Sequence, residues 1–409
     1  MFNVEWVQHA VGHGGFHTGR ARADHAPPLN WIFDCGAKKT AVFDAYLKAW
    51  TTQHQQPIDW LFISHFDTDH VSGLDTLMSR AVVREVMVPY VNERELILQV
   101  LHEVDRGRLD RSFFELAADP AAFFLARGAQ RVSFIRDGGP RTEAAIGGDP
   151  GPDFPRREGE WTLKVDPPAR PLPLPPLYRA TLGPALQVRE IDSASFIAAV
   201  FGPYGLRFIP HRAPVSPATH KGLLADLIAL VGRAPARLKR PGLGDCAFAI
   251  ANHARTASGR AQLRKLFKAH VGSSNRSSLS ILSVPHVADT SQANWHRVSP
   301  VMRSWGEGIP AWLNTGDAEL LAPGDLADWR AAFHPLLPQV QVLALPHHGS
   351  DKNSDASLQA LVPSAVLVAH VKADSSKHPG IDVTAFAGER LACVSGQPGS
   401  EVCLHFWLP

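Results

Sequence analysis

Cysteine is scarce in this chain. Four of the 409 residues are cysteines, namely Cys35, Cys246, Cys393 and Cys403. They lie too far apart to form the paired spacing of a zinc or redox motif. Scattered cysteines are typical of reduced, mostly buried thiols, so we expect a cytoplasmic protein.

The chain also lacks a strong excess of charge and a long apolar run. Its formal net charge of +2 excludes attraction of nucleic acid by the whole molecule and leaves that role to a local basic patch. No stretch approaches the roughly 18 apolar residues of a membrane span. Residues 1–7 carry no basic leader segment and have the pattern of a strand. We therefore expect no membrane association.

Several catalytic machineries are missing as well. The sequence has no glycine-rich phosphate loop ending in Lys-Ser or Lys-Thr, and no G-x-S-x-G nucleophile elbow. What is present is typical of a globular protein of one large or two ordinary domains, with 45% hydrophobic and 20% charged residues. Histidine is frequent, at 20 residues, which suits a metalloenzyme.

Short strand patterns alternate with helical patterns at both ends of the chain, which predicts an α/β fold. Strands are expected at 4–11, 31–36, 60–63, 82–89, 206–210, 277–284, 311–314, 340–345, 365–371 and 402–407. Helices are expected at 40–51, 72–80, 92–105, 222–233, 261–270, 324–333 and 357–361.

The middle of the chain has a different composition. Residues 138–177 are rich in proline, glycine and arginine and predict a long loop or linker. We therefore divide the chain into a first half of the fold at 1–105, an insertion or accessory region at 106–270, and a second half at 271–409.

The most informative stretch is His65-Phe66-Asp67-Thr68-Asp69-His70. It directly follows the apolar run 60–63, so a buried strand delivers two histidines and two carboxylates into one tight loop. Such a loop can hold two divalent cations close together, an arrangement that activates water against phosphoryl or acyl groups. An ordinary polar loop is the alternative, but the density of ligand atoms favours a metal site.

Two further strand ends carry metal-capable side chains. Asp317 follows the strand expected at 311–314, where its two carboxylate oxygens can bridge two cations. His347 and His348 follow the strand expected at 340–345, and imidazole suits zinc and manganese alike. Which of the two histidines faces the metal stays open, and the other is expected to orient substrate or a ligand.

Four more side chains are weaker candidates. His378, after the strand expected at 365–371, is either a last ligand, a general acid for the leaving group or an exposed turn residue. Asp34 ends the second strand and is expected near the metals as a partner of a ligand. His13 and His17 flank Gly14-Gly15 and are expected at the edge of the cleft, with a weaker signal.

The 65–70 loop, with Ser72-Gly73-Leu74 behind it, resembles the HxHxDH signature of the metallo-β-lactamase fold superfamily, with Asp67 in place of the second histidine. This variant resembles the soluble domain of ComEC-type competence proteins. Further blocks match that domain in order: 31–36 as a strand ending in Asp-x-Gly, 275–279 as Asn-x-x-Ser-Leu, 313–318 as Leu-x-Thr-Gly-Asp-Ala, 347–350 as His-His-Gly-Ser, and His378-Pro379. Residues 106–270 are unmatched.

The resemblance implies a four-layer αβ/βα sandwich with two divalent metal ions at one sheet edge. By position, the metal ligands would be His65, Asp67, Asp69, His70, a bridging Asp317, and His347 or His348. A metal-bound hydroxide would be the nucleophile, and Asp69 its proton acceptor. The membrane channel of the competence proteins is absent, and the turn at 12–16 matches only loosely. Since Asp67 replaces an imidazole, Mn²⁺ or Mg²⁺ becomes credible beside Zn²⁺.

Three functions remain open. The leading one is a phosphodiesterase or nuclease on DNA or RNA, supported by the carboxylate-rich site and by basic segments at 233–240 and 260–268, which are otherwise solvated helix faces. The second is a small-molecule ester, lactone or thioester hydrolase, with Phe196, Phe201, Tyr204 and Phe208 either lining an apolar pocket or forming core. The third is an effector regulated by a protein partner that binds the 106–270 region.

Overall fold

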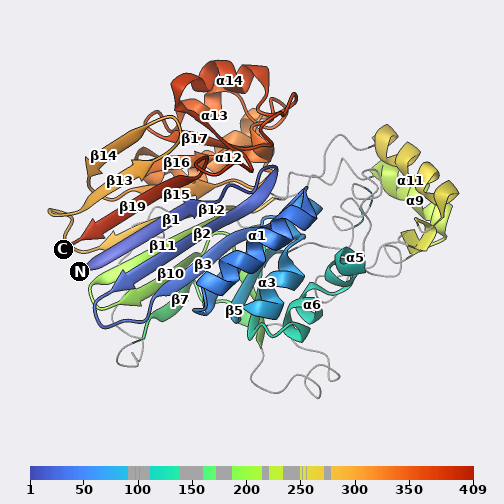
Figure 1. Ribbon diagram of the computed structural model, residues 1–409. Coiled ribbons are helices and arrows are strands. Elements are labelled where there is room, and N and C mark those ends of the chain that lie inside the picture. Colours follow the sequence, from blue (N-terminus) through green and yellow to red (C-terminus); the bar gives the residue numbers. More distant parts are fainter. Residues whose placement is uncertain are drawn as a thin grey trace.

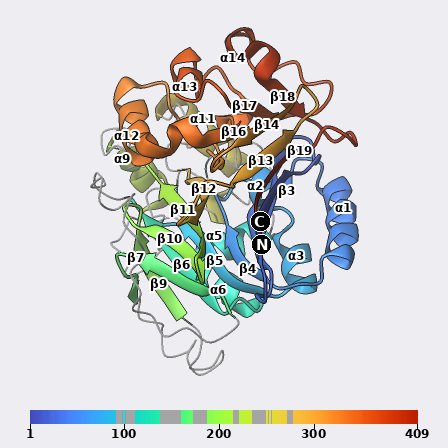
Figure 2. The same ribbon diagram turned by 90° about the vertical axis from the view of Figure 1, so that its left-hand side faces the viewer.

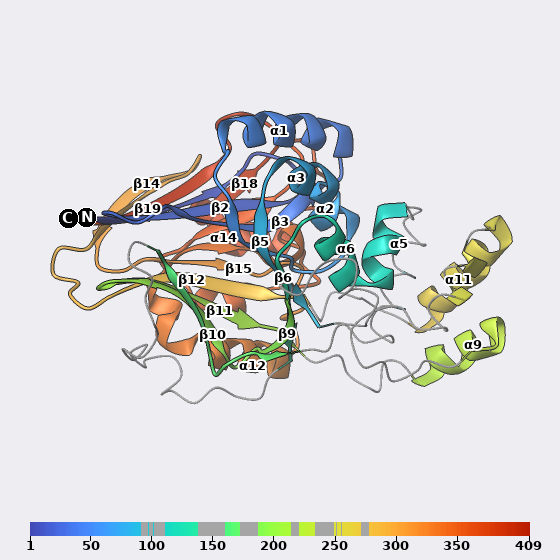
Figure 3. The ribbon, with the colours of Figure 1, turned by 90° about the horizontal axis from the view of Figure 1, so that it is seen from below.

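Two β-sheets lie face to face and helices cover their outer faces, which gives a four-layer αβ/βα sandwich (Figure 3). The computed structural model describes residues 1–90, 97, 101, 111–137, 160–171, 187–213, 221–233, 249–250, 252–254, 256–270 and 278–409. The α/β four-layer architecture expected from the sequence is confirmed.

The larger sheet, sheet A, has eleven strands among the described residues. Strands β3, β4, β5, β6 and β9 run parallel, whereas β1 pairs antiparallel with both β2 and β19. In spatial order the strands are β14 (Arg303–Glu307), β13 (Asn294–Val298), β19 (Val402–Leu408), β1 (Phe2–Gln8), β2 (Gly14–Ala23), β3 (Leu29–Ala37), β4 (Ile58–Phe62), β5 (Val83–Pro89), β6 (Arg131–Arg136), β9 (Gln187–Asp192) and β8 (Arg170–Pro171).

Sheet B has eight described strands, of which β15 to β18 are parallel and the others antiparallel. In spatial order they are β18 (Leu391–Val394), β17 (Val366–His370), β16 (Val340–Ala344), β15 (Ala311–Asn314), β12 (Ser280–Val287), β11 (Tyr204–His211), β10 (Phe196–Phe201) and β7 (Thr162–Asp166).

The helices lie on both outer faces. Against sheet A pack α1 (Thr40–Gln53), α3 (Leu74–Arg80), α5 (Arg111–Ala118) and α6 (Pro120–Ala126), as Figure 2 shows for α1 and α3. Against sheet B pack α12 (Pro323–Phe333), the 3-10 helix η3 (His334–Gln339), α13 (Ala356–Ala360) and α14 (Ile381–Ala387), and η5 (Gly388–Arg390) follows α14. Helices α9 (Lys221–Val231) and α11 (Ala257–His270) lie away from both sheets, on the side of α5 (Figure 1), and bury Leu227 and Leu263 in the same core cluster as the helices on sheet A.

Aromatic side chains fill the space between the sheets. Phe208 of sheet B contacts Trp31, Trp60 and Phe62 of sheet A, with ring centroids 5.1–5.2 Å apart. Phe196 and Phe208 are buried, and Phe201 and Tyr204 pack against this central core. Phe196 and Phe208 are therefore core residues, whereas Phe201 and Tyr204 are partly buried and pack against the core. For this second pair the alternative of an apolar pocket stays a prediction.

Most predicted elements exist, with shifted ends. The strand expected at 4–11 is β1 and ends at Gln8. The helix expected at 72–80 is α3, which begins at Leu74 and follows a separate short helix, α2 (Thr68–Val71). The helix expected at 92–105 lies outside the described residues except for 97 and 101. The basic segment 233–240 is described only at Arg233, which is exposed.

The range 106–270 supplies strands to both sheets, namely β6, β8 and β9 in sheet A and β7, β10 and β11 in sheet B. The prediction of a loop over all of 138–177 is wrong within 160–171. There β7 pairs with β10 and places Leu163 and Val165 against the core. The rest of that segment lies outside the described residues. The division of the chain at 105 and 270 stays a prediction.

The sequence predicts reduced cysteines and no membrane-spanning segment. Among the described cysteines, Cys35, Cys393 and Cys403 form no disulfide. No described helix is both long enough and apolar enough to cross a membrane. A cytoplasmic location stays a prediction.

Gly36 allows the end of β3 to approach the 65–70 loop closely. A Cβ atom there would lie 2.6 Å from the backbone carbon of His70 and from the nitrogen of Val71. We expect Gly36→Ala to lower the free energy of unfolding by about 1–3 kcal/mol through overpacking, as measured by urea denaturation. Gly324→Ala is the control, because no atom lies within 4 Å of its Cβ position. Equal stability of the two variants would contradict this account.

Candidate metal centre

The metal-capable side chains converge at one edge of the sandwich. Parallel strands end at the same edge of a sheet, and ligands of α/β folds bind outside those carboxyl ends. The 65–70 loop follows β4, Asp317 follows β15, and the histidine pair lies in the 3-10 helix η4 (Pro346–His348) after β16. A backbone bond from Leu279 N to Ser64 O, 2.8 Å long, joins sheet B to the loop of sheet A at this edge.

Three side chains form a first group, which we define as His65, His70 and Asp317; one ligand atom of each lies within 4.8 Å of the others. Asp317 Oδ2 is 3.6 Å from His65 Nε2, and Asp317 Oδ1 is 3.4 Å from His70 Nε2. Two more side chains border this group, because Asp67 Oδ2 is 3.8 Å from His65 Nε2 and His347 Nδ1 is 3.8 Å from Asp317 Oδ2.

A second group consists of His13, Asp69 and His348, and its ligand atoms also lie within 4.8 Å of one another. Asp69 Oδ2 is 3.5 Å from His348 Nε2 and 3.6 Å from His13 Nε2. The two groups are neighbours, since Asp69 and His70 are consecutive and the rings of His70 and His348 have centroids 5.7 Å apart.

These side chains fit divalent cations. The Nε2 atoms of His65, His70 and His348 are buried, and each lacks a hydrogen-bond partner among the described residues. A buried polar atom without a partner is costly, and coordination would satisfy it. Imidazole with carboxylate suits Zn²⁺ or Mn²⁺, and the carboxylates alone also suit Mg²⁺.

Asp34 fixes the orientation of His70. Its Oδ2 accepts a hydrogen bond from His70 Nδ1 at 2.7 Å and from Ser64 Oγ at 2.8 Å, and its Oδ1 accepts from Ser64 N at 2.7 Å. With Nδ1 bound to Asp34, Nε2 of His70 faces Asp317. Such carboxylate–histidine pairs orient the ligand ring and increase its basicity.

Backbone strain is concentrated at this edge. Asp34, His347 and His348 have φ angles of 58°, 46° and 59°, in the left-handed region that side chains beyond glycine rarely adopt. Each such residue costs about 1–3 kcal/mol, and they cluster at functional sites. The strain turns His347 toward Asp317 and His348 toward Asp69, so the two histidines face different carboxylates.

Electrostatics keeps the carboxylates ionised. Burial favours the neutral form of Asp317, but His347, His65 and His70 outweigh it and hold the pKa of Asp317 well below its usual range. Burial is similarly outweighed at Asp69 by His348, His70 and Lys38, and the pKa of that carboxyl is also well below its usual range. Both side chains are therefore anionic at neutral pH and able to bind cations.

The imidazoles differ in charge. Burial, together with His70, lowers the pKa of His65 and leaves this ring neutral. For His70, burial is outweighed by Asp34 and Asp317, which raise its pKa well above the usual value. A divalent cation at Nε2 of His70 would replace that proton, so binding there releases a proton.

All the predicted ligands lie at this edge: His65, Asp67, Asp69, His70, Asp317, His347 and His348. His378 borders it, with its ring centroid 5.6 Å from that of His347. His13 also borders it, whereas His17 is buried between the sheets against Trp312, with ring centroids 4.6 Å apart. The expectation that His17 edges the site is therefore wrong, because β2 directs its side chain inward. The metal-binding roles stay predictions.

Sequence reasoning assigned no role to three side chains at this edge. Ser64 bonds both Asp34 and His65, and Ser278 Oγ accepts a hydrogen bond from Asp317 N at 2.9 Å. Lys38 Nζ lies 3.6 Å from Asp69 Oδ2. Ser64 directly precedes the 65–70 loop and Lys38 follows the Asp-x-Gly block by two residues, so only their neighbourhood in sequence hinted at a role.

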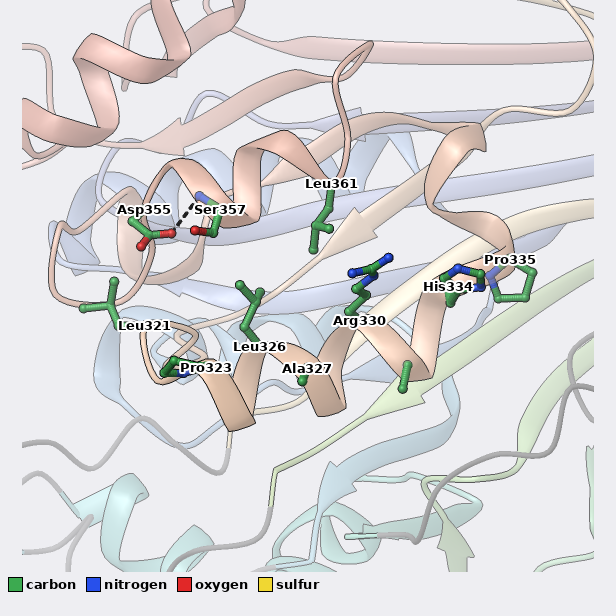
Figure 4. Close-up of a pocket in the computed structure, with 11 residues that line it drawn as sticks. Leu321, Pro323, Leu326, Ala327, Arg330, His334, Pro335, Asp355, Ser357 and Leu361 are labelled. Carbon is green, nitrogen blue, oxygen red and sulfur yellow. Dashed lines mark hydrogen bonds between the residues drawn. The ribbon is translucent and has the colours of Figure 1, made fainter.

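Away from the candidate metal centre, a pocket with a volume of about 850 Å³ lies between α12 and α13 (Figure 4). Leu326 and Leu361 line its apolar part, Arg330 lies between them and His334, and Asp355 accepts a hydrogen bond from Ser357 N. None of the candidate ligands lines this pocket. Its size therefore gives no information about the substrate of the metal centre.

The sequence profile of the metallo-beta-lactamase superfamily matches residues 30–160, which include Asp34 and the 65–70 loop. With the four-layer architecture, this match identifies the fold as the metallo-β-lactamase fold. No protein with a curated description matches the chain. The narrower resemblance to ComEC-type proteins stays a prediction.

Three solved structures are similar to this chain at low identity. The metallo-β-lactamase MIM-1 from Novosphingobium pentaromativorans is 12% identical, with a TM-score of 0.26, covering 94% of this chain and 87% of its own. The Rm3 metallo-beta-lactamase is 12% identical, with a TM-score of 0.27 and coverages of 93% and 88%. The long form of RNase Z from yeast is 7% identical, with a TM-score of 0.32; the match covers 90% of this chain but only 36% of that enzyme. These values carry no information about activity.

Asp34→Asn tests the geometry of the centre. Replacing the carboxylate weakens its hydrogen bond to His70 Nδ1, so we expect metal affinity to fall by about 10–100-fold in calorimetric titrations. Asp59→Asn is the matched control, because Asp59 is a buried carboxylate of the same sheet that also accepts a backbone bond, from Asn30 N at 2.8 Å. A comparable loss in both variants would refute a specific role for Asp34.

Proposed function

We propose that this protein is a metal-dependent phosphodiesterase, most specifically a nuclease acting on DNA or RNA with two divalent metal ions, Zn²⁺ or Mn²⁺. The observation that carries the proposal is the pair of adjacent His–carboxylate groups at one sheet edge, His65/His70/Asp317 and His13/Asp69/His348. Two sites a few ångströms apart are typical of enzymes that displace an oxygen at phosphorus.

When bound, two divalent cations would stabilise the negative charge that develops during ester hydrolysis and favour deprotonation of the attacking water. In this proposal, Asp317 faces His65 through Oδ2 and His70 through Oδ1. Asp34 holds the His70 ring in place. The low pKa of Asp69 makes it a better ligand than proton acceptor, so the role of base implied by the family resemblance is the weaker of its two roles.

His378 is the proposed proton donor to the leaving group. Its ring is half-buried at the mouth of the centre, 5.9 Å from that of His13 between centroids. Burial, then His347 and His348, lower the pKa of His378 to about 4. A bound phosphodiester adds negative charge next to the ring and raises this pKa, which favours the protonated form during the reaction.

A set of lysines supports an anionic substrate. We define the lysine rim as Lys38, Lys39, Lys372 and Lys377, which lie on the β3–α1 connection and on the loop that carries His378. Lys39 and Lys372 both lower the pKa of Asp374, after a backbone hydrogen bond, so the two loops are neighbours. A local positive patch of this kind attracts a phosphate backbone although the net charge of the chain is only +2.

The alternative of a small-molecule ester, lactone or thioester hydrolase has weaker support. Two of the four aromatics expected to line its pocket, Phe196 and Phe208, are part of the core, and the pocket of Figure 4 lies away from the candidate ligands. A regulatory partner acting through 106–270 is not part of the proposal.

The decisive assay supplies Zn²⁺, Mn²⁺ or Mg²⁺ with linear and circular DNA, RNA and bis-p-nitrophenyl phosphate. We expect cleavage of at least one nucleic acid that is abolished by EDTA and reduced at least about 100-fold in Asp69→Ala and Asp317→Asn. Hydrolysis of the small ester without any nucleic acid cleavage would refute the nuclease. Activity that survives both substitutions would refute the metal assignment.

The lysine rim predicts a salt-dependent effect. In a Lys372→Met/Lys377→Met variant, we expect weaker binding of single-stranded DNA and a salt slope reduced by about 0.7 for each lost phosphate contact. Fluorescence anisotropy at several salt concentrations measures both. Lys48→Met/Lys265→Met removes the same charge from α1 and from the basic helix α11. A larger loss of DNA affinity in that second variant would show that α1 and α11, and not the lysine rim, bind the DNA.

A further inference from the structure

The substitution of Asp67 for a histidine leaves the metal centre one imidazole short of the family signature. Asp67 lies next to the first group, with its Oδ2 3.8 Å from His65 Nε2. The first group nevertheless has His65 and His70, with His347 beside Asp317. The second group depends on the consecutive residue Asp69 and on His348, so it is the group for which a further nitrogen ligand matters most.

His13 supplies such a nitrogen. It lies in the turn between β1 and β2, and its backbone oxygen accepts a hydrogen bond from Lys38 N at 2.8 Å. Its ring contacts that of His348, with centroids 3.9 Å apart, and its Nε2 is 3.6 Å from Asp69 Oδ2. The side chain is only 10% exposed, so its Nε2 lies at the buried edge beside Asp69 and His348.

Lys38 already contacts this position. Its ammonium donates a hydrogen bond to Nε2 of His13 and lies 3.6 Å from Asp69 Oδ2. These are two of the three ligand atoms of the second group. A lone pair that accepts a hydrogen bond cannot bind a metal at the same time, and a positive charge next to the site repels a divalent cation.

We infer that His13, Asp69 and His348 hold the second cation, and that the Lys38 ammonium competes for this site. The inference rests on the metal-dependent part of the proposed function. Its consequence is sequential loading. The first group binds its cation without displacing a side chain, whereas the second group binds only after Lys38 has moved away.

Calorimetric titration of metal-free protein with Zn²⁺ tests this order. We expect two binding events of unequal affinity in the wild type and loss of the weaker event alone in His13→Gln. In Lys38→Met, we expect the weaker event to tighten by roughly 10-fold, the lower end of what neighbours of metal ligands contribute. Lys39→Met removes the adjacent exposed lysine and is expected to leave both events unchanged. Circular dichroism and thermal unfolding establish that each variant is folded.

Several results would overturn the inference: both events retained with unchanged affinity in folded His13→Gln, an unchanged weaker event in Lys38→Met, or equal effects of Lys38→Met and Lys39→Met. A single Zn²⁺ in both wild type and Lys38→Met would also overturn it. Hydrolysis of bis-p-nitrophenyl phosphate distinguishes failure of this inference from failure of the proposed function. If the titration gives one of these results but metal-dependent hydrolysis persists, only the inference fails. If the wild type binds no Zn²⁺, the inference and the proposed function are both refuted.

Discussion

The hydrogen bond between the Asp34 carboxylate and His70 Nδ1 is the interaction on which the candidate metal centre depends. It links β3 to the loop after β4, and through Nε2 of His70 it reaches Asp317 of the other sheet, at 3.4 Å. Two buried carboxylates, one of them on a strained backbone, are thereby held beside one imidazole, which costs folding energy that the hydrophobic core must offset. A centre of this kind is stable only because two large sheets fix its walls from both sides.

The sequence was sufficient for the parts of the centre that follow apolar runs. The run 60–63 and the loop behind it predict a strand that ends in ligands, and parallel pairing of β3 with β4 and of β15 with β16 brings those ends together. Asp317 and the histidine pair follow the same logic. What pattern alone did not decide was which histidine faces which carboxylate, because the left-handed backbone of His347 and His348 sets their directions.

The middle of the chain was less predictable. Strand β7 lies in the proline- and glycine-rich segment 138–177. Strands β7, β9 and β10 complete the sheets through pairing partners far away in sequence, as β7 with β10 and β6 with β9. Strand propensity is decided by such neighbours rather than by the segment itself. His17 was misjudged for a related reason: in β2, alternate side chains point to opposite faces, and its position directs it between the sheets.

The pairing of β1 with both β2 and β19 has a consequence for biosynthesis. The strand that flanks β1 on its other side is Val402–Leu408, so every earlier stage of synthesis leaves β1 with an unpaired edge. Unpaired edges are templates for association between chains. Nascent chains of this protein therefore carry an aggregation hazard on the ribosome until β19 has emerged, and molecular chaperones that shield edge strands would bear on its yield.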